Sequence, residues 1–287
     1  MDIRSIVVGV DGSSASDTAV DWAAAEAVRR GVPLEVLHTS TTHAAVPGGG
    51  APPSYDETED EDVLDAAAAR ARGAFAGISV ITRSERRDPA SALIERSTGA
   101  ELVVVGAHGK GLLARFLLGS VSHRVSTHAR CPAVVVHQEV GTPGLPVAVG
   151  VDDSPASDAA VALAVDEAVL RGVALVVVHG WQPVTVGAFD ALPVSQEVID
   201  SMHATAREVV SRAVAIAHDR APGLAVTSTM PSTGAVLALD AESADAQLLV
   251  VGVHGRRGLA GAPFGSVTSA VLDGARCPVM VAPLPTT

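Results

Sequence analysis

A glycine-containing stretch that occurs twice in this chain constrains its fold more than any other feature of the sequence. Both copies fit the spacing Gly, two residues, Gly, nine residues, Gly-Ser, in Gly106, Gly109, Gly119 and Ser120 and again in Gly252, Gly255, Gly265 and Ser266. Each copy follows a short apolar run and precedes a segment of helical character, so it is predicted to connect a strand to a helix. Glycine allows close backbone approach and positive φ, and a helix N-terminus attracts anions. The stretch therefore predicts a phosphate-binding loop in each half of the chain.

The similarity between the two halves extends well beyond these loops. The strand-like segment Ser5–Asp11 matches Pro146–Asp152 at an offset of 141, and the glycine loops match at an offset of 146. Similarity in register over such a length indicates duplication, and two domains suit a chain of 287 residues. We predict one domain over residues 1–138 and a second over residues 146–287, joined by a short linker rich in glycine and proline.

Strands are expected to alternate with helices along each half, which predicts an α/β fold with a parallel sheet and right-handed crossovers. The low aromatic content of 2% beside 48% apolar residues suits a sheet that is buried on both faces. We expect two tandem Rossmann-like domains with flavodoxin-like strand order, each a five-stranded parallel sheet flanked by helices. The first helix is expected to have Ser14 or Ser16 as N-cap and Gly31 as C-cap, and the third strand is expected over residues 78–82.

The charge balance argues against nucleic acid as a partner. The net charge is −12 and Lys110 is the only lysine, whereas a surface that binds duplexes needs clustered basic residues. The sequence has no apolar run long enough for a membrane span, and its first residues lack a signal-peptide pattern. We therefore expect a soluble, cytoplasmic protein.

The two cysteines stand at matching places in the repeat, Cys131 and Cys277. One cysteine per domain provides neither a CxxC motif nor a disulfide framework, so both are interpreted as small buried residues. A redox or metal role is the less favoured alternative. No cluster of residues at metal-ligand spacing is evident, and no metal site is predicted.

An aspartate ends the first strand of each half. Ligands of parallel α/β sheets bind beyond the carboxyl ends of the strands, where the strand order reverses. With flavodoxin-like order, we expect Asp11 to share a crevice with Gly106, and Asp152 to share one with Gly252. A carboxylate there accepts hydrogen bonds from ribose hydroxyls or a base amine, while the helix N-terminus holds phosphates. A plain turn or cap role would explain either aspartate alone, but the recurrence favours two nucleotide sites.

Several common catalytic motifs are missing from the sequence. It contains neither a Walker A loop nor a G-x-S-x-G nucleophile elbow, and no GxGxxG fingerprint follows the first strand. The loop histidines His108 and His254 are interpreted as surface or packing residues. No catalytic residue is assigned, and a regulator is favoured over an enzyme. A slow ATPase or nucleotidyl transferase on the same scaffold is the alternative, and an interaction scaffold with degenerate sites is a third possibility.

The Val-Asp pair that ends the first strand, together with the glycine pattern after the fourth, resembles the universal stress protein family over nearly the whole chain, once per half. This resemblance implies the α/β fold, ATP at each glycine loop with Mg²⁺ as a candidate companion, and a homodimer. It also implies an unidentified regulatory protein partner and a role in the response to stress, in dormancy or in growth. By position, the implied ATP contacts are Asp11, Thr39, Gly106, Gly109, Gly119, Ser120, Val121 and Ser122, and in the second half Asp152, Gly180, Gly252, Gly255, Gly265, Ser266, Val267 and Thr268.

The second loop differs from the first in composition. It contains Pro263, and Gly261 stands where the first loop has Arg115. We therefore expect the two sites to differ in their affinity for phosphate.

Overall fold

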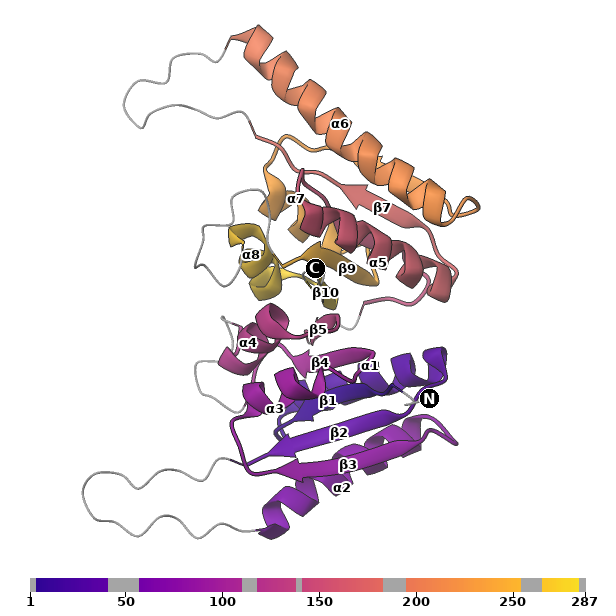
Figure 1. Ribbon diagram of the computed structural model, residues 1–287, viewed down its shortest axis with the longest axis vertical. Coiled ribbons are helices and arrows are strands. Elements are labelled where there is room, and N and C mark those ends of the chain that lie inside the picture. Colours follow the sequence, from indigo (N-terminus) through magenta and orange to yellow (C-terminus); the bar gives the residue numbers. More distant parts are fainter. Residues whose placement is uncertain are drawn as a thin grey trace, which may run out of the picture. The chain divides into compact units, whose positions relative to one another are not determined.

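The computed structural model describes residues 4–40, 57–109, 118–137, 141–182, 195–253 and 265–283. The chain divides into two compact units, Met1–Val140 and Gly141–Thr287 (Figure 1). The elements of the first unit are β1 (Ile6–Val10), α1 (Ser14–Arg30), β2 (Leu34–Thr39), α2 (Glu57–Ala74), β3 (Val80–Glu85), α3 (Pro89–Arg96), β4 (Leu102–Gly106), α4 (Ser120–His128) and β5 (Ala133–Val136). Those of the second are β6 (Val147–Gly150), α5 (Pro155–Arg171), β7 (Leu175–Val178), α6 (Gln196–Arg220), β8 (Val226–Thr229), α7 (Ala235–Ser243), β9 (Leu248–Gly252), α8 (Ser266–Gly274) and β10 (Val279–Ala282).

Each unit contains a parallel sheet, as predicted, but the strand order differs from the expected one. The order is β3-β2-β1-β4-β5 in the first unit and β8-β7-β6-β9-β10 in the second, and the pairs within each unit are parallel. This is the Rossmann order, and the prediction of flavodoxin-like order is wrong. The chain continues outward from β2 to β3 and then crosses back, so β4 pairs directly with β1. In flavodoxin-like order another strand would separate those two.

The helices cover the sheet of each unit in pairs. In the first unit α1 packs against α2, and α3 packs against α4; in the second, α5 pairs with α6 and α7 with α8. Because the chain moves one way along the sheet through α1 and α2 and the other way through α3 and α4, right-handed crossovers place the two pairs on opposite faces. The winding reverses at β1 and β4, and at β6 and β9, which places a crevice beyond the carboxyl ends of those strands.

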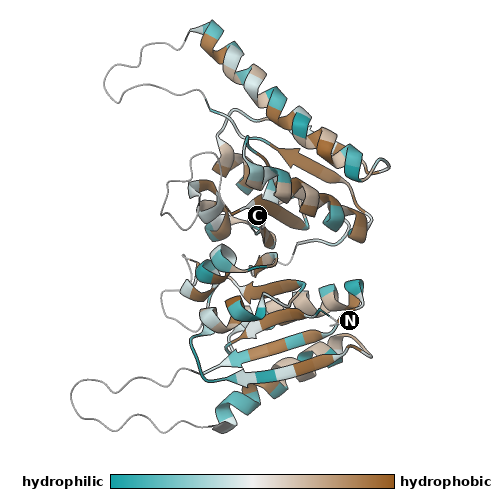
Figure 2. Ribbon diagram, in the orientation of Figure 1, coloured by the Kyte–Doolittle hydropathy of each residue, from teal (hydrophilic) through white to brown (hydrophobic). Residues whose placement is uncertain are grey.

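The apolar residues are concentrated in the strands, as Figure 2 shows by colour. Strands β1, β4 and β5 consist of buried residues apart from the glycines, which is expected for a sheet covered on both faces. Strand β3 differs because most of its residues are exposed. It lies at the edge of its sheet, where one side and part of a face remain open to water.

Local signals explain where the first helix of each unit begins and ends. The Ser13 hydroxyl accepts a hydrogen bond from the Ser16 N–H and caps α1, so the expectation of Ser14 or Ser16 as N-cap is wrong by one or more residues. Gly31, with φ of 67°, ends α1 as predicted. Ser154 and Gly172 play the same parts in α5.

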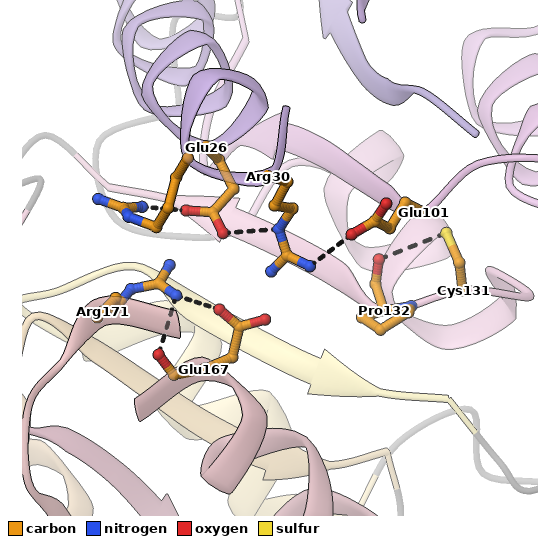
Figure 3. A network of polar contacts seen from close by, with 8 residues as sticks. Glu26, Arg30, Glu101, Cys131, Pro132, Glu167 and Arg171 are labelled. Atoms are coloured by element: carbon orange, nitrogen blue, oxygen red, sulfur yellow. Dashed lines mark hydrogen bonds and ion pairs between the residues drawn. The ribbon is translucent and has the colours of Figure 1, made fainter. Parts of the chain in front are cut away.

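Each of these helices also carries a buried ion pair near its C-terminus (Figure 3). The fully buried Glu26 accepts from Arg29 and from Arg30, whose Nε lies 2.8 Å from Glu26 Oε1, and Arg30 continues to Glu101 at 2.8 Å. In the second unit Glu167 pairs with Arg171, and both side chains are almost completely buried. Each of these buried carboxylates has an arginine partner, because a charge that is removed from water must be paired to be tolerated.

Both cysteines are buried, as predicted. Burial raises the pKa of the Cys131 thiol and of the Cys277 thiol from 9.0 to about 12. The unfolded chain therefore loses these protons at lower pH than the folded chain. The stabilisation associated with the protonated thiols is complete below the unfolded pKa and is lost as pH rises toward the folded one.

We accordingly expect the free energy of unfolding to fall by about 1 kcal/mol per thiol between about pH 8 and about pH 10. Urea unfolding followed at both pH values measures this slope. The Cys131→Ala/Cys277→Ala double variant should show a shallower fall, because the other titrating groups are unchanged. An equal slope in the two proteins would contradict the assignment to the thiols.

Among the described helices, none combines the length and the apolar character that a membrane span requires.

Candidate functional site

In each unit the predicted aspartate and the first glycine of the loop lie at the carboxyl ends of two adjacent strands. β1 pairs with β4 from Ile6 opposite Leu102, so Asp11, which follows β1, lies next to Gly106 at the end of β4. β6 pairs with β9 in the same way, which brings Asp152 next to Gly252. The predicted neighbourhood of aspartate and glycine loop is thus present twice, and the observed strand order provides it.

In the first unit the Asp11 carboxylate faces the glycine loop directly. Its Oδ1 accepts a hydrogen bond from the Ser13 N–H at 3.0 Å. Its Oδ2 lies so close to Gly109 that a Cβ on that residue would be 2.9 Å from the oxygen. One oxygen therefore orders the turn into α1, and the other approaches a loop backbone that has no side chain in the way.

The glycines that end the fourth strands are required by space. A Cβ on Gly106 would lie 2.8 Å from the Ala15 carbonyl oxygen, and one on Gly252 would lie 3.0 Å from the Ala156 oxygen. These contacts let the first helix of each unit begin directly against the loop. The expected positive φ is not found at Gly106, Gly109, Gly119, Gly252 or Gly265, so the glycines serve close approach and not a left-handed backbone.

A hydroxyl group in the first turn of the next helix ties that helix to the end of the strand before each loop. The Ser122 hydroxyl donates to the Gly106 carbonyl at 2.6 Å, and the Thr268 hydroxyl donates to the Gly252 carbonyl at 2.8 Å. Both side chains belong to buried residues. They fix the first turns of α4 and α8 relative to the strand ends, which explains the choice of serine or threonine at this place in both halves.

The N-termini of α4 and α8 remain without a side-chain cap among the described residues. Gly119 and Gly265 occupy the N-cap positions and provide no hydrogen-bonding side chain, whereas serines cap α1 and α5. Ser120 and Ser266 are exposed there. An open helix N-terminus offers N–H groups and the positive end of the helix dipole to an anion.

Two of the predicted contacts lie at the ends of the second strands. Thr39 ends β2, is half-buried and pairs with Glu85. Gly180 lies beyond β7, where a Cβ would be 2.6 Å from the backbone of Gly234 and of Ala235. The start of α7 therefore packs on Gly180, and this packing alone accounts for the glycine.

A contact that the sequence did not suggest holds the second aspartate. The Ser154 hydroxyl donates to Asp152 Oδ1 at 2.5 Å while it also caps α5. The Asp152 N–H in turn donates to the Ser157 hydroxyl at 3.1 Å. The signal in the sequence is a serine two residues after the aspartate.

Part of each loop lies outside the described residues. This applies to Gly255 among the predicted contacts, and also to Lys110, Arg115, His254, Gly261 and Pro263. Val121 and Val267 are half-buried in the first turns of α4 and α8. Within the described ranges, no group of three or more His, Cys, Asp or Glu side chains is arranged to hold a metal ion.

The fold and the repeated site define a class of protein: tandem doubly wound α/β units, each with an aspartate and a glycine loop at the point where the strand order reverses. The chain belongs to the universal stress protein family, whose model matches residues 2–137 and 145–283. A universal stress protein of Mycobacterium tuberculosis is 40% identical over 293 residues, covering 97% of each chain. One from Mycolicibacterium smegmatis is 37% identical, covering 96% of each.

The solved structures agree with this fold. The crystal structure of a universal stress protein from Archaeoglobus fulgidus superposes with a TM-score of 0.70, at 19% identity, covering 99% of this chain and 100% of the other. At this level of identity the likeness concerns the fold. The resemblance inferred from the sequence and the predicted α/β class are therefore confirmed.

Proposed function

We propose that each unit binds ATP at its glycine loop and that the chain acts as a regulator of the stress response, dormancy or growth. The observation that carries this proposal is the twofold occurrence of one arrangement: an aspartate beside a glycine loop that leads into a helix without a side-chain cap. In this proposal the aspartate accepts hydrogen bonds from ribose hydroxyls. The backbone N–H groups at Ser120 and Val121, and at Ser266 and Val267, receive the phosphates.

Mg²⁺ is included as a companion of the phosphates, which usually supply much of its coordination together with water. Regulation requires that ATP bind two states of the protein, or of its complexes, with different affinity. We include a homodimer and a regulatory protein partner as the elements through which occupancy is transmitted. Light scattering of the purified chain with and without ATP tests the dimer.

Mass spectrometry of the small molecules released from freshly purified protein, followed by calorimetric titration of the stripped chain with ATP, tests the proposal. We expect released adenine nucleotide and two binding events per chain, with unequal affinities. Protein that is nucleotide-free after purification and shows no heat of binding contradicts it. Phosphate release over multiple turnovers, with binding unchanged, would instead support the ATPase alternative.

A further inference from the structure

A histidine at the end of the second strand holds the peptide that precedes each aspartate. The Nδ1 atom of His38 donates to the Val10 carbonyl at 2.8 Å, and Nδ1 of His179 donates to the Val151 carbonyl at 2.7 Å. The donor is assigned to the ring because a carbonyl only accepts. Asp11 and Asp152 are the next residues in the chain. The ring therefore restricts the direction in which each carboxylate leaves its strand.

Within the residues that the structure describes, the first unit alone extends this contact to a second side chain. His38 Nε2 lies 3.1 Å from Oδ1 of Asp60 in α2, and Oδ2 of Asp60 accepts from the Ser84 hydroxyl of β3 at 3.3 Å. Asp60 is only 7% exposed. Nδ1 of the ring thus faces the Val10 carbonyl oxygen, and Nε2 faces the Asp60 carboxylate. A buried carboxylate held from β3 in this way fixes the plane of the imidazole.

The second unit has no such carboxylate in its described residues. Arg70 contacts Asp17 in the first unit as Arg212 contacts Asp158 in the second, which aligns α2 with α6 and places Met202 at the position of Asp60. A methionine thioether is only a weak acceptor and cannot replace the carboxylate as the partner of the ring. Beside Met202, His203 instead contacts the ring of Trp181, with the ring centroids 5.5 Å apart. The two units therefore share the contact from histidine to the peptide, but only His38 has a carboxylate partner within the described residues.

We propose that His38 and Asp60 are positioning residues for the nucleotide site of the first unit. The inference rests on the proposed function, because it assumes that Asp11 contacts the nucleotide. Asp60 orients the His38 ring, the ring holds the Val10 carbonyl, and the fixed peptide directs the Asp11 carboxylate toward the ribose. The second site obtains its orientation from the Ser154 hydroxyl instead. Affinity at the first site thus depends on a carboxylate in α2 that does not touch the ligand.

Calorimetric titration of the full chain with ATP tests the dependence on Asp60. In Asp60→Leu we expect affinity at the first site to fall about tenfold, equivalent to ~1.4 kcal/mol, with the second site unchanged. Asp60→Asn should stay within about twofold of the wild type, because an amide N–H donates to Nε2 of a neutral ring while its oxygen still accepts from Ser84. The matched control at the aligned position, Met202→Leu, should leave both affinities unchanged.

Substitution of His38 separates positioning from a general loss of stability. His38→Leu should weaken the first site like Asp60→Leu, and the two changes combined should be no worse than either alone, since they break one chain of contacts. His38→Asn should restore much of the affinity, because its amide nitrogen can replace Nδ1 as the donor to Val10. Binding at the second site reports in every variant that the chain is folded. Should Asp60→Leu fail to fold, His38→Leu and His38→Asn carry the same comparison.

Unchanged first-site affinity in both Asp60→Leu and His38→Leu, beside wild-type binding at two sites, overturns this inference and leaves the proposed function standing. Affinities for the two sites that fall together overturn it as well, because the effect would then not belong to the first site. A wild-type chain that binds no ATP overturns the proposed function, and this inference with it.

Discussion

Gly109→Ala should weaken ATP binding at the first site by about tenfold or more, which corresponds to a loss of ~1.4 kcal/mol or more. The new Cβ would lie 2.9 Å from Asp11 Oδ2, a distance that forces the carboxylate or the loop to move. Because the same carboxylate is proposed to contact the ribose, its displacement costs a charge-assisted hydrogen bond. Calorimetric titration should show the affinity of the first site reduced by this factor, with that of the second site unchanged.

The chain provides a matched control for this substitution. A Cβ on Gly73 in α2 meets no atom within 4 Å, so Gly73→Ala should leave both affinities unchanged and stabilise the helix by about 0.5–1 kcal/mol. Asp11→Glu, which adds one methylene group on the other side of the same contact, should act in the same direction as Gly109→Ala. Normal first-site affinity in both Gly109→Ala and Asp11→Glu would show that the nucleotide binds elsewhere.

Arg171→Met should lower the free energy of unfolding by up to about 3–5 kcal/mol, because it removes a charged partner from the buried Glu167 carboxylate. Glu167 and Arg171 are both almost completely buried, and the Arg171 guanidinium also donates to the Glu167 carbonyl at 3.4 Å. Urea unfolding of the variant, followed by circular dichroism, measures the loss. Replacement of both residues, as Glu167→Leu/Arg171→Met, should recover most of it, since a well-packed apolar pair is often as stable as a buried ion pair.

Two other arginines allow a test of how strongly the loss of unfolding free energy depends on burial of the ion pair. Arg220 pairs with Asp166 in α5, but both side chains are about half exposed, so Arg220→Met should cost no more than about 1 kcal/mol. In the first unit Arg30→Met should cost less than Arg171→Met, because the Arg30 side chain is 15% exposed whereas that of Arg171 is 4% exposed. If Arg171→Met unfolded at the same urea concentration as Arg220→Met, burial would not be the cause that we assign.

The parts of this fold that repeat in the sequence were the parts that could be predicted from it. Residues such as Asp11 and Gly106 can be recognised from their immediate sequence context, because a carboxylate or a glycine follows or ends an apolar run. The second copy of the pattern shows that this arrangement is not a coincidence. Strand β3 was placed over residues 78–82 but covers Val80–Glu85. Its charged residues are tolerated because it is an exposed edge strand, and Arg83 pairs with Glu35 of the neighbouring strand at 3.1 Å.

Contacts between residues that are far apart in the sequence could not be predicted from sequence patterns. Glu35 lies in an apolar strand and is buried, and its partner Arg96 comes from α3, 61 residues away. The corresponding residue of the second unit is Val176, which is also buried, so nothing local indicates which unit carries a charge there. The strand order was missed for a similar reason, because the direction of each crossover depends on packing between whole helices and the sheet.

The buried thiols limit how this chain can respond to oxidants. Sensor cysteines react as exposed thiolates of low pKa, whereas burial keeps Cys131 and Cys277 protonated, with the pKa of each raised to about 12. These are the only cysteines in the sequence. In its folded form the chain therefore has no thiol suited to read the redox state of its surroundings.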